Sequence, residues 1–304
     1  MTDPTPHDPH AHYTPVDRSV PQPGQGGSSR KVTIWTVAAI LALAFTAFCV
    51  FLVMSRLDDQ PSEADGVEWP ANMRTGGILF ESGSGGLTPV RSDAPQAGAV
   101  PEPVEADRAS GPLDIQLYVD YRCPACAAFE LENAALLEEA VTNGDATLEE
   151  AVTNGDATLE VRPMTFLDDD TQYSSRAAGA VACVVDGEPE LAWNAHTALL
   201  DPRIQPGHED PGLENDEIVG VIERATGELD GATRSCIEDE RFAPFAQALN
   251  AWASSTPIVE ADDADATVAH TPFVIAGGAV YEGEASDGDA FAAFLAEQGL
   301  QGAR

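Results

Sequence analysis

The pattern of hydrophobic and polar positions sets one apolar run near the N-terminus apart from the rest of the chain. This run covers residues 32–54 (VTIWTVAAILALAFTAFCVFLVM) and contains no charged side chain. Its 23 residues are enough for a helix to cross about 30 Å of hydrocarbon, which predicts one transmembrane helix. The run is longer than the apolar core of a signal peptide, and no clear small-x-small cleavage site follows it. We therefore expect a retained anchor.

The segments on either side of this run lack the hydrophobic period of a folded domain. Residues 1–31 are rich in Pro, Gly, Ser and His and are predicted to form a disordered tail. Residues 55–75 are expected to be a tether, and residues 76–304 the folded domain. Within that domain, residues 81–112 are again rich in Gly and Pro, which favours a surface connection.

The folded domain alternates between strand and helix patterns. Short apolar runs rich in β-branched and aromatic residues predict strands, whereas apolar positions three and four residues apart predict helices. In chain order, the pattern predicts a short strand at 78–80, a strand at 113–119, a helix from Cys123, a strand at 159–166, a mostly helical stretch at 172–255, a hairpin at 272–276 and 279–282, and a helix at 287–298. This order indicates an α/β fold.

A perfect tandem repeat separates the first predicted helix from the strand that follows it. The sequence LEEAVTNGDAT occupies residues 137–147 and again residues 148–158. Eleven residues make about three helical turns, so the second copy could extend the helix. However, Asn143-Gly144 is a helix-stop signal, and a glycine inside a helix costs about 1 kcal/mol. We expect the helix to end near Gly144 and the second copy to form a surface excursion.

The charge of the chain excludes one class of partner and orients the anchor. The chain has 51 acidic and 15 basic residues and a net charge of -36, so it would repel nucleic acid. Arg30 and Lys31 precede the apolar run, whereas Asp58 and Asp59 follow it. By the positive-inside rule, the N-terminus is expected in the cytoplasm and the folded domain outside the cell membrane, on the oxidising side.

Cysteine spacing supplies the candidate chemistry. Cys49 lies in the apolar run, which leaves four cysteines and three possible complete pairings. The spacing favours a short bridge between Cys123 and Cys126, which leaves Cys183 and Cys236 as the second pair.

The Cys-Pro-Ala-Cys motif could also be half of a zinc site or a purely structural bridge. A structural zinc site needs four ligands, and the sequence has no second C-x-x-C and no H-x-x-x-H. The histidines at positions 7, 10 and 12 lie in the expected tail without a cysteine or carboxylate cage. We therefore expect neither a metal nor another cofactor.

The position of the motif favours a redox role. With Cys123 at a strand-to-helix junction and Pro124 in the first turn, the free N–H groups and the positive end of the helix favour a thiolate on Cys123. Arg122 could assist, although an exposed arginine is more often solvated. Cys126 lies one turn into the helix, so it should be less accessible and act as the resolving thiol.

Two motifs resemble a known family. The segment YVDYRCPACAAFE resembles the active-site segment of DsbA-like thiol:disulfide oxidoreductases, and AHTPFVIAGG resembles the loop and strand that carry their cis-proline. The resemblance covers about residues 76–304 and implies a thioredoxin fold with a helical insertion at about 171–256. Some relatives hold a structural disulfide there, as Cys183 and Cys236 would. The resemblance implies these roles: nucleophile Cys123, resolving cysteine Cys126, cis-proline Pro272, and substrate-binding residues Thr271, Pro124 and Ala125.

The chain departs from the family pattern at two positions. Relatives often have a buried acid six residues before the first active-site cysteine, where this chain has Leu117; Asp120 is three residues before it, which makes a proton relay through the acid doubtful. His270 stands where glycine is common, and could tune the site or simply be an exposed loop residue. His196 and Trp193 are expected to be packing residues.

The resemblance implies an extracytoplasmic, membrane-anchored oxidase that introduces disulfides into unfolded or reduced exported proteins. A quinone-linked membrane protein of the DsbB or vitamin-K-epoxide-reductase-like type would then reoxidise it. A disulfide reductase or isomerase, for example in cytochrome maturation, would use the same cysteines. A redox-inactive envelope binding module stapled by its bridge is the alternative from another class.

Overall fold

The structure is a computed structural model of the chain, and it describes residues 66–83, 86–103, 108, 112–143, 157–207 and 210–300. The chain divides into two units, residues 1–60 and 61–304, and all described residues belong to the second. The expected tail, the predicted membrane span and residues 144–156 of the repeat lie outside the described residues. No helix in the described part is both long and apolar enough to cross a bilayer.

Six strands form one mixed sheet in the order β2-β1-β4-β3-β5-β6. The strands are β1 (Ile78–Gly83), β2 (Gly86–Pro89), β3 (Leu113–Val119), β4 (Ala157–Pro163), β5 (Phe273–Ala276) and β6 (Ala279–Val280). β3 and β4 are parallel, and the other neighbouring pairs are antiparallel. β3 is buried along almost its whole length, as expected for a central strand covered on both faces.

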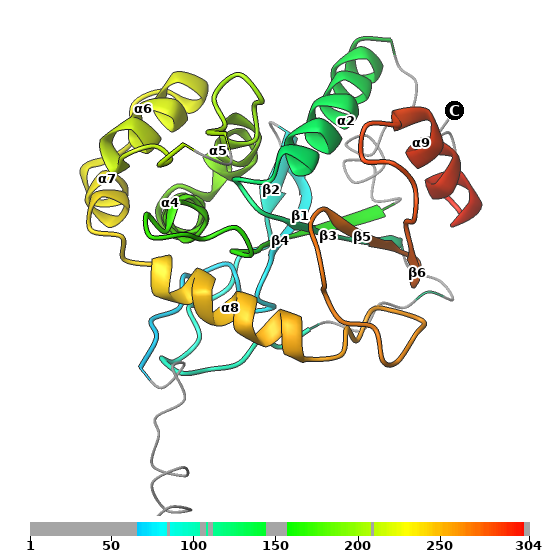
Figure 1. Cartoon of the computed structure of the whole chain (residues 1–304), viewed down its shortest axis with the longest axis horizontal. Coiled ribbons are helices and arrows are strands. Elements are labelled where there is room, and N and C mark those ends of the chain that lie inside the picture. Colours follow the sequence, from blue (N-terminus) through cyan, green and yellow to red (C-terminus); the bar gives the residue numbers. More distant parts are fainter. Residues whose placement is uncertain are drawn as a thin grey trace, which may run out of the picture. The chain divides into compact units, whose positions relative to one another are not determined.

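Helices cover both faces of this sheet. They are α2 (Pro124–Asn143), α4 (Tyr173–Gly187), the short 3₁₀ helix η1 (Pro189–Leu191), α5 (Ala192–Leu199), α6 (Asn215–Thr226), α7 (Gly231–Glu238), α8 (Ala243–Ser255) and α9 (Gly288–Glu297). In Figure 1, α2 and α9 lie on one side of the sheet and α8 on the other, while α4 to α7 gather at one end. Asp230 and Asp287 cap α7 and α9, because their carboxylates accept first-turn N–H groups.

Most of the predicted elements are present. The strand at 113–119 has the predicted bounds, the hairpin turns at Gly277-Gly278, and the stretch 172–255 is mostly helical. α2 extends to Asn143, the last described residue before the gap at 144–156, so the helix end near Gly144 stays a prediction. The prediction for the end of the second repeat copy is wrong, because residues 157–158 belong to β4 and pair with β3.

Two predicted connections are more ordered than their composition suggests. Residues 66–75, expected in the tether, pack into the domain, where Trp69 and Met73 are buried and the Trp69 ring lies 5.0 Å from that of Phe245. Residues 81–112, expected to be a surface connection, contain β2, whose Leu87 is buried. Both segments have too few apolar residues between their Gly and Pro positions to show a period, and long-range packing orders them.

A buried cluster of charges ties the central strands to the loop that precedes β5. The Arg162 guanidinium donates to the Glu160 carboxylate at 3.0 Å, to the Glu260 carboxylate at 2.7 Å and to the Tyr118 hydroxyl at 2.6 Å. All four side chains are buried. Breaking a buried ion pair leaves an uncompensated charge, so the cluster holds the Glu260 loop against β3 and β4.

A disulfide closes the helical insertion. Cys183 of α4 and Cys236 of α7 are bonded, as predicted, and they lie 53 residues apart in the sequence. The bond joins two helices that already pack on each other, so it restricts the unfolded chain more than it alters the folded contacts.

Replacing Cys183 and Cys236 together by alanine should lower the free energy of unfolding by about 4 kcal/mol, the chain-entropy value for a loop of this length. Urea unfolding without reductant measures the difference, with Cys123 and Cys126 replaced by serine in both proteins for this measurement alone, because a reductant would also open the Cys183–Cys236 bond in the unfolded chain. The reactivity of Cys123 should be unchanged in the variant. A loss of less than about 1 kcal/mol would show that the bond does not contribute by this mechanism.

Candidate active site

The strand-to-helix junction places Cys123 at the N-terminus of α2. The Cys123 N–H donates to the Asp120 carbonyl at 2.9 Å, and the Cys123 carbonyl accepts the Ala127 N–H at 3.1 Å. Pro124 is the first residue of the helix, where its missing N–H leaves no hydrogen bond unmade. The Cys123 sulfur therefore lies where the first N–H groups of the helix are free to donate.

These donors stabilise a thiolate on Cys123. The hydrogen bond with the Cys126 thiol is the largest cause that lowers the pKa of Cys123, to about 6. Thr271 and the backbone N–H groups of Cys126 and Ala125 lower it further, while burial opposes the shift. Cys123 is therefore largely ionised at neutral pH, and a thiolate of low pKa is both reactive and a good leaving group.

Cys126 has the opposite character. It is fully buried, and burial together with the neighbouring Cys123 raises its pKa well above the ordinary value. The Asp120 N–H lies 3.5 Å from its sulfur. Both cysteines are buried and neither is in a disulfide in this structure, with Cys123 7% exposed and Cys126 not exposed at all. A thiol of lowered pKa therefore lies beside a more deeply buried thiol of raised pKa, as expected for a nucleophile and a resolving cysteine.

The loop before β5, which is far from Cys123 in the sequence, completes the site. The Thr271–Pro272 peptide bond is cis, as the resemblance implies. The Cys123 thiol lies 3.3 Å from the Thr271 carbonyl, although the two residues are 148 positions apart. His270 is exposed, and its Nδ1 lies 3.1 Å from the Pro272 carbonyl, so it braces the loop.

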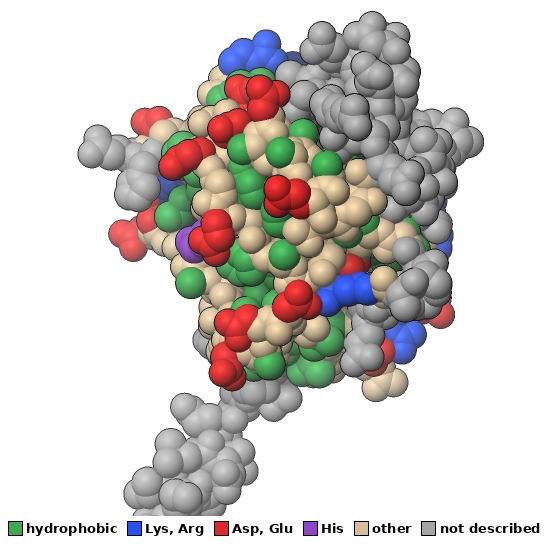
Figure 2. Space-filling model, turned by 90° about the vertical axis from the view of Figure 1, so that its right-hand side faces the viewer, with side chains coloured by type: hydrophobic (Ala, Val, Ile, Leu, Met, Phe, Trp, Pro, Cys, Tyr) green, Lys and Arg blue, Asp and Glu red, His purple; other side chains and the backbone are tan. Residues whose placement is uncertain are grey.

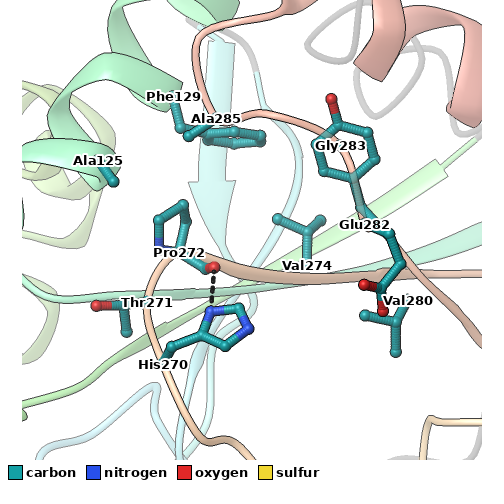
Figure 3. A pocket seen from close by; sticks show the side chains of 11 residues that line it. Ala125, Phe129, His270, Thr271, Pro272, Val274, Val280, Glu282, Gly283 and Ala285 are labelled. Carbon is teal, nitrogen blue, oxygen red and sulfur yellow. Dashed lines mark hydrogen bonds between the residues drawn. The ribbon is translucent and has the colours of Figure 1, made fainter.

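A cavity of about 300 Å³ opens beside this loop. In Figure 3, Ala125 and Phe129 of α2 form one wall and the loop between β6 and α9 the other, with Pro272 between them. The lining residues are Ala125, Phe129, His270, Thr271, Pro272, Val274, Val280, Tyr281, Glu282, Gly283 and Ala285. Apolar side chains make up more than half of the lining, and His270, Thr271 and Glu282 add polar groups.

The surface around the cavity is acidic. Among residues 242–300 every charged side chain is Asp or Glu, with His270 the one group that could become cationic. Figure 2 shows the side of the molecule that carries α9, where acidic side chains are scattered among hydrophobic ones. The charges of this part of the chain therefore repel anionic molecules.

Arg122 is not the solvated side chain expected for an exposed arginine. Its side chain is buried, its guanidinium donates to the Asp169 carboxylate at 2.6 Å, and it also donates to the Asp210 carbonyl. Both partners are distant in sequence, so the local pattern gave no sign of the burial. The causes that lower the pKa of Cys123 are hydrogen bonds from other groups.

Asp120 occupies a buried position close to the cysteines. Its carboxylate accepts hydrogen bonds from the Arg122 N–H, the Leu167 N–H and the Ser174 hydroxyl, and burial raises its pKa. Leu117, at the position where relatives often have an acid, is a buried core residue. The carboxylate bonds to the turn and the insertion, while the Asp120 backbone contacts Cys126.

Sequence reasoning missed two contacts that reach the active-site turn from the insertion. The Gln205 side chain donates to the carbonyls of Tyr121 and Cys123, and nothing in its turn sequence predicts this. His196 is buried, as expected for a packing residue, but it also hydrogen-bonds to the Tyr121 hydroxyl. Among the described residues, no group of three or more His, Cys, Asp or Glu side chains could hold a metal.

Comparisons with known proteins agree with this architecture. A family model described as Thioredoxin matches residues 108–296. The oxidised DsbA of Mycobacterium tuberculosis is 23% identical, with a TM-score of 0.50 over 74% of this chain and 93% of its own. The reduced form of that DsbA is 22% identical, with a TM-score of 0.50 over 75% of this chain and 95% of its own. These likenesses show a shared thioredoxin fold. No curated protein sequence matches this chain significantly.

The Cys123 thiol should titrate with a midpoint near pH 6, because hydrogen bonds from Cys126 and the start of α2 stabilise its thiolate. The ultraviolet absorbance of the thiolate in the reduced full chain measures this midpoint, and Cys123→Ser should abolish the transition. Below the midpoint, the alkylation rate should fall about tenfold per pH unit, as the thiolate fraction does. A midpoint near the ordinary value of about 8.5 would contradict the assigned geometry.

Proposed function

The chain belongs to the thioredoxin family, and we propose that it is a thiol:disulfide oxidoreductase that introduces disulfides into exported proteins. One observation carries the proposal: a low-pKa cysteine at a helix N-terminus lies within 3.3 Å of the loop that ends in a cis-proline, with a buried thiol one turn away. The adjacent cavity, which has both apolar and polar lining residues, offers room for client side chains. This combination supports a role in disulfide exchange over a purely structural disulfide, because a structural disulfide needs no stabilised thiolate.

The exchange follows from the asymmetry of the pair. In the oxidised enzyme, a client thiolate attacks the Cys123 sulfur and the Cys123–Cys126 bond breaks, so that Cys126 leaves and takes up a proton. The second client thiolate then attacks the client sulfur of the mixed disulfide, and Cys123 leaves as a thiolate. The client gains a disulfide and loses two electrons, and the enzyme gains two electrons. Thr271 and the cavity hold the client chain beside the reacting sulfur.

The thiolate on Cys123 favours oxidation of the client over its reduction. Because the pKa of Cys123 is lower in the folded protein than in an unfolded chain, the thiolate stabilises the reduced enzyme at neutral pH. This stabilisation is lost as the pH falls through about 6. A dithiol whose reduced form is stabilised is a stronger oxidant, so we infer a reduction potential above the thioredoxin value of about -270 mV, in the direction of the DsbA value of about -120 mV.

Oxidation of a reduced, unfolded peptide with two cysteines tests the proposal. The oxidised full chain should convert the peptide to its disulfide form with equal formation of reduced enzyme, measured by thiol alkylation and mass spectrometry. Cys123→Ser should abolish the reaction. Cys126→Ser, which cannot form the oxidised pair, should also fail to oxidise the peptide, but its Cys123 thiolate should form a mixed disulfide when the peptide is supplied in its disulfide form. Oxidation that persists in Cys123→Ser would refute the proposal, and a potential near that of thioredoxin would favour a reductase or isomerase.

We also propose that the apolar run at 32–54 anchors the enzyme in the cell membrane with its catalytic domain outside. The flanking charges and the need for an oxidising compartment support this arrangement. Protease added to intact, wall-free cells should remove the domain of residues 61–304 and leave an N-terminal epitope protected. Protection of the domain, or its recovery in a soluble fraction, would contradict the proposed topology.

A further inference from the structure

An amide side chain of the helical insertion bonds to two carbonyls of the active-site turn. Nε2 of Gln205 donates to the Tyr121 carbonyl at 2.9 Å and to the Cys123 carbonyl at 3.1 Å. Gln205 lies in the turn after α5, where its own N–H donates to the Asp201 carbonyl at 2.8 Å. One NH₂ group therefore bridges the Tyr121–Arg122 and Cys123–Pro124 peptide units.

The neighbouring residues of the same turn are also bonded to the insertion. The Tyr121 hydroxyl lies 2.9 Å from Nδ1 of His196, and the Arg122 guanidinium donates to Asp169 and to the Asp210 carbonyl. Tyr121, Arg122 and Cys123 thus all have polar partners in the part of the chain that follows β4. The side chains of Tyr121 and Arg122 are buried, so these bonds compete little with water.

The Gln205 bonds act on backbone groups whose orientation governs the site. The Cys123 carbonyl already accepts the Ala127 N–H in the first turn of α2, and Gln205 occupies its second acceptor position. With the Tyr121 and Cys123 carbonyls both held, the Tyr121–Arg122 and Cys123–Pro124 peptide planes have little freedom to rotate, and the Cys123 N–H between them is bonded to the Asp120 carbonyl. The Cys123 sulfur then stays in reach of the Ala125 and Cys126 N–H groups, which stabilise its thiolate only while they point at it.

We propose that Gln205 is a positioning residue that sets the reactivity of Cys123, so that the helical insertion tunes the redox pair through the backbone of the active-site turn. The inference rests on the proposed redox role of Cys123. Gln205 touches neither sulfur in the described contacts, and it acts through the two carbonyls. The insertion thereby has a role in the chemistry besides covering the sheet.

Gln205→Met tests this inference, because methionine has a similar length and no donor. In the reduced full chain, the titration midpoint of Cys123 should rise by about 0.5 to 1 unit as the turn loosens. At a pH well below the midpoint, the alkylation rate should fall about three- to tenfold, in proportion to the thiolate fraction. The equilibrium with glutathione should shift in the same direction, towards a weaker oxidant.

Gln247→Met is the matched control. Gln247 is a half-buried amide of α8 that donates to the Ser175 hydroxyl at 3.2 Å, away from the cysteines. Its loss should destabilise the domain to a similar extent and leave the midpoint and the alkylation rate of Cys123 unchanged. Equal shifts in the two variants would mean that general loosening, not positioning, is responsible, and this would overturn the inference.

The remaining outcomes are also decisive. If Gln205→Met does not fold, Gln205→Asn serves instead, because its amide is one methylene too short to span both carbonyls. A wild-type midpoint near pH 6 with no shift in the folded Gln205 variant would overturn the role of Gln205 and leave the proposed function intact. A wild-type midpoint at the ordinary value of about 8.5 would overturn both.

Discussion

The hydrogen bonds that converge on the Cys123 sulfur depend on where β3 ends and α2 begins. The buried central strand β3 ends just before the active-site turn, and α2 begins at Pro124, directly after Cys123. The first N–H groups of α2 have no partner within the helix, so a negative charge at this point is stabilised without a cationic side chain. Cys126, one turn later, faces the core and remains protonated. One junction thereby gives two adjacent cysteines opposite properties.

The register of the sheet brings the second half of the site to this junction. Tyr118 of β3 pairs with Phe273 of the antiparallel strand β5, so the chain leaves β3 and enters β5 at the same edge. Residues that follow β3 and residues that precede β5 therefore lie side by side, which explains how Thr271 comes within 3.3 Å of Cys123. Arg162 binds Glu260 within the core and holds the start of that loop in place.

Local patterns predicted what neighbouring residues determine, and they missed what distant residues determine. The strand-to-helix junction and the hairpin at Gly277-Gly278 were predictable, because periodicity and turn chemistry are local. The burial of Trp69 and of Arg122 was not predictable in this way, since each depends on a partner far along the chain. The contact of Gln205 with the turn belongs to the same class, because 82 residues separate it from Cys123.

The need to satisfy backbone groups explains why the insertion supplies these distant partners. A turn that carries a reactive cysteine cannot use its own carbonyls in a β-ladder, and a buried carbonyl without a donor is destabilising. The Tyr121 side chain is fully buried, so water is a poor substitute there. A side chain from elsewhere must supply the donor, and Gln205 does so for two carbonyls at once. The same two hydrogen bonds also limit how the turn can move. They therefore satisfy the backbone carbonyls and orient the Cys123 sulfur at the same time.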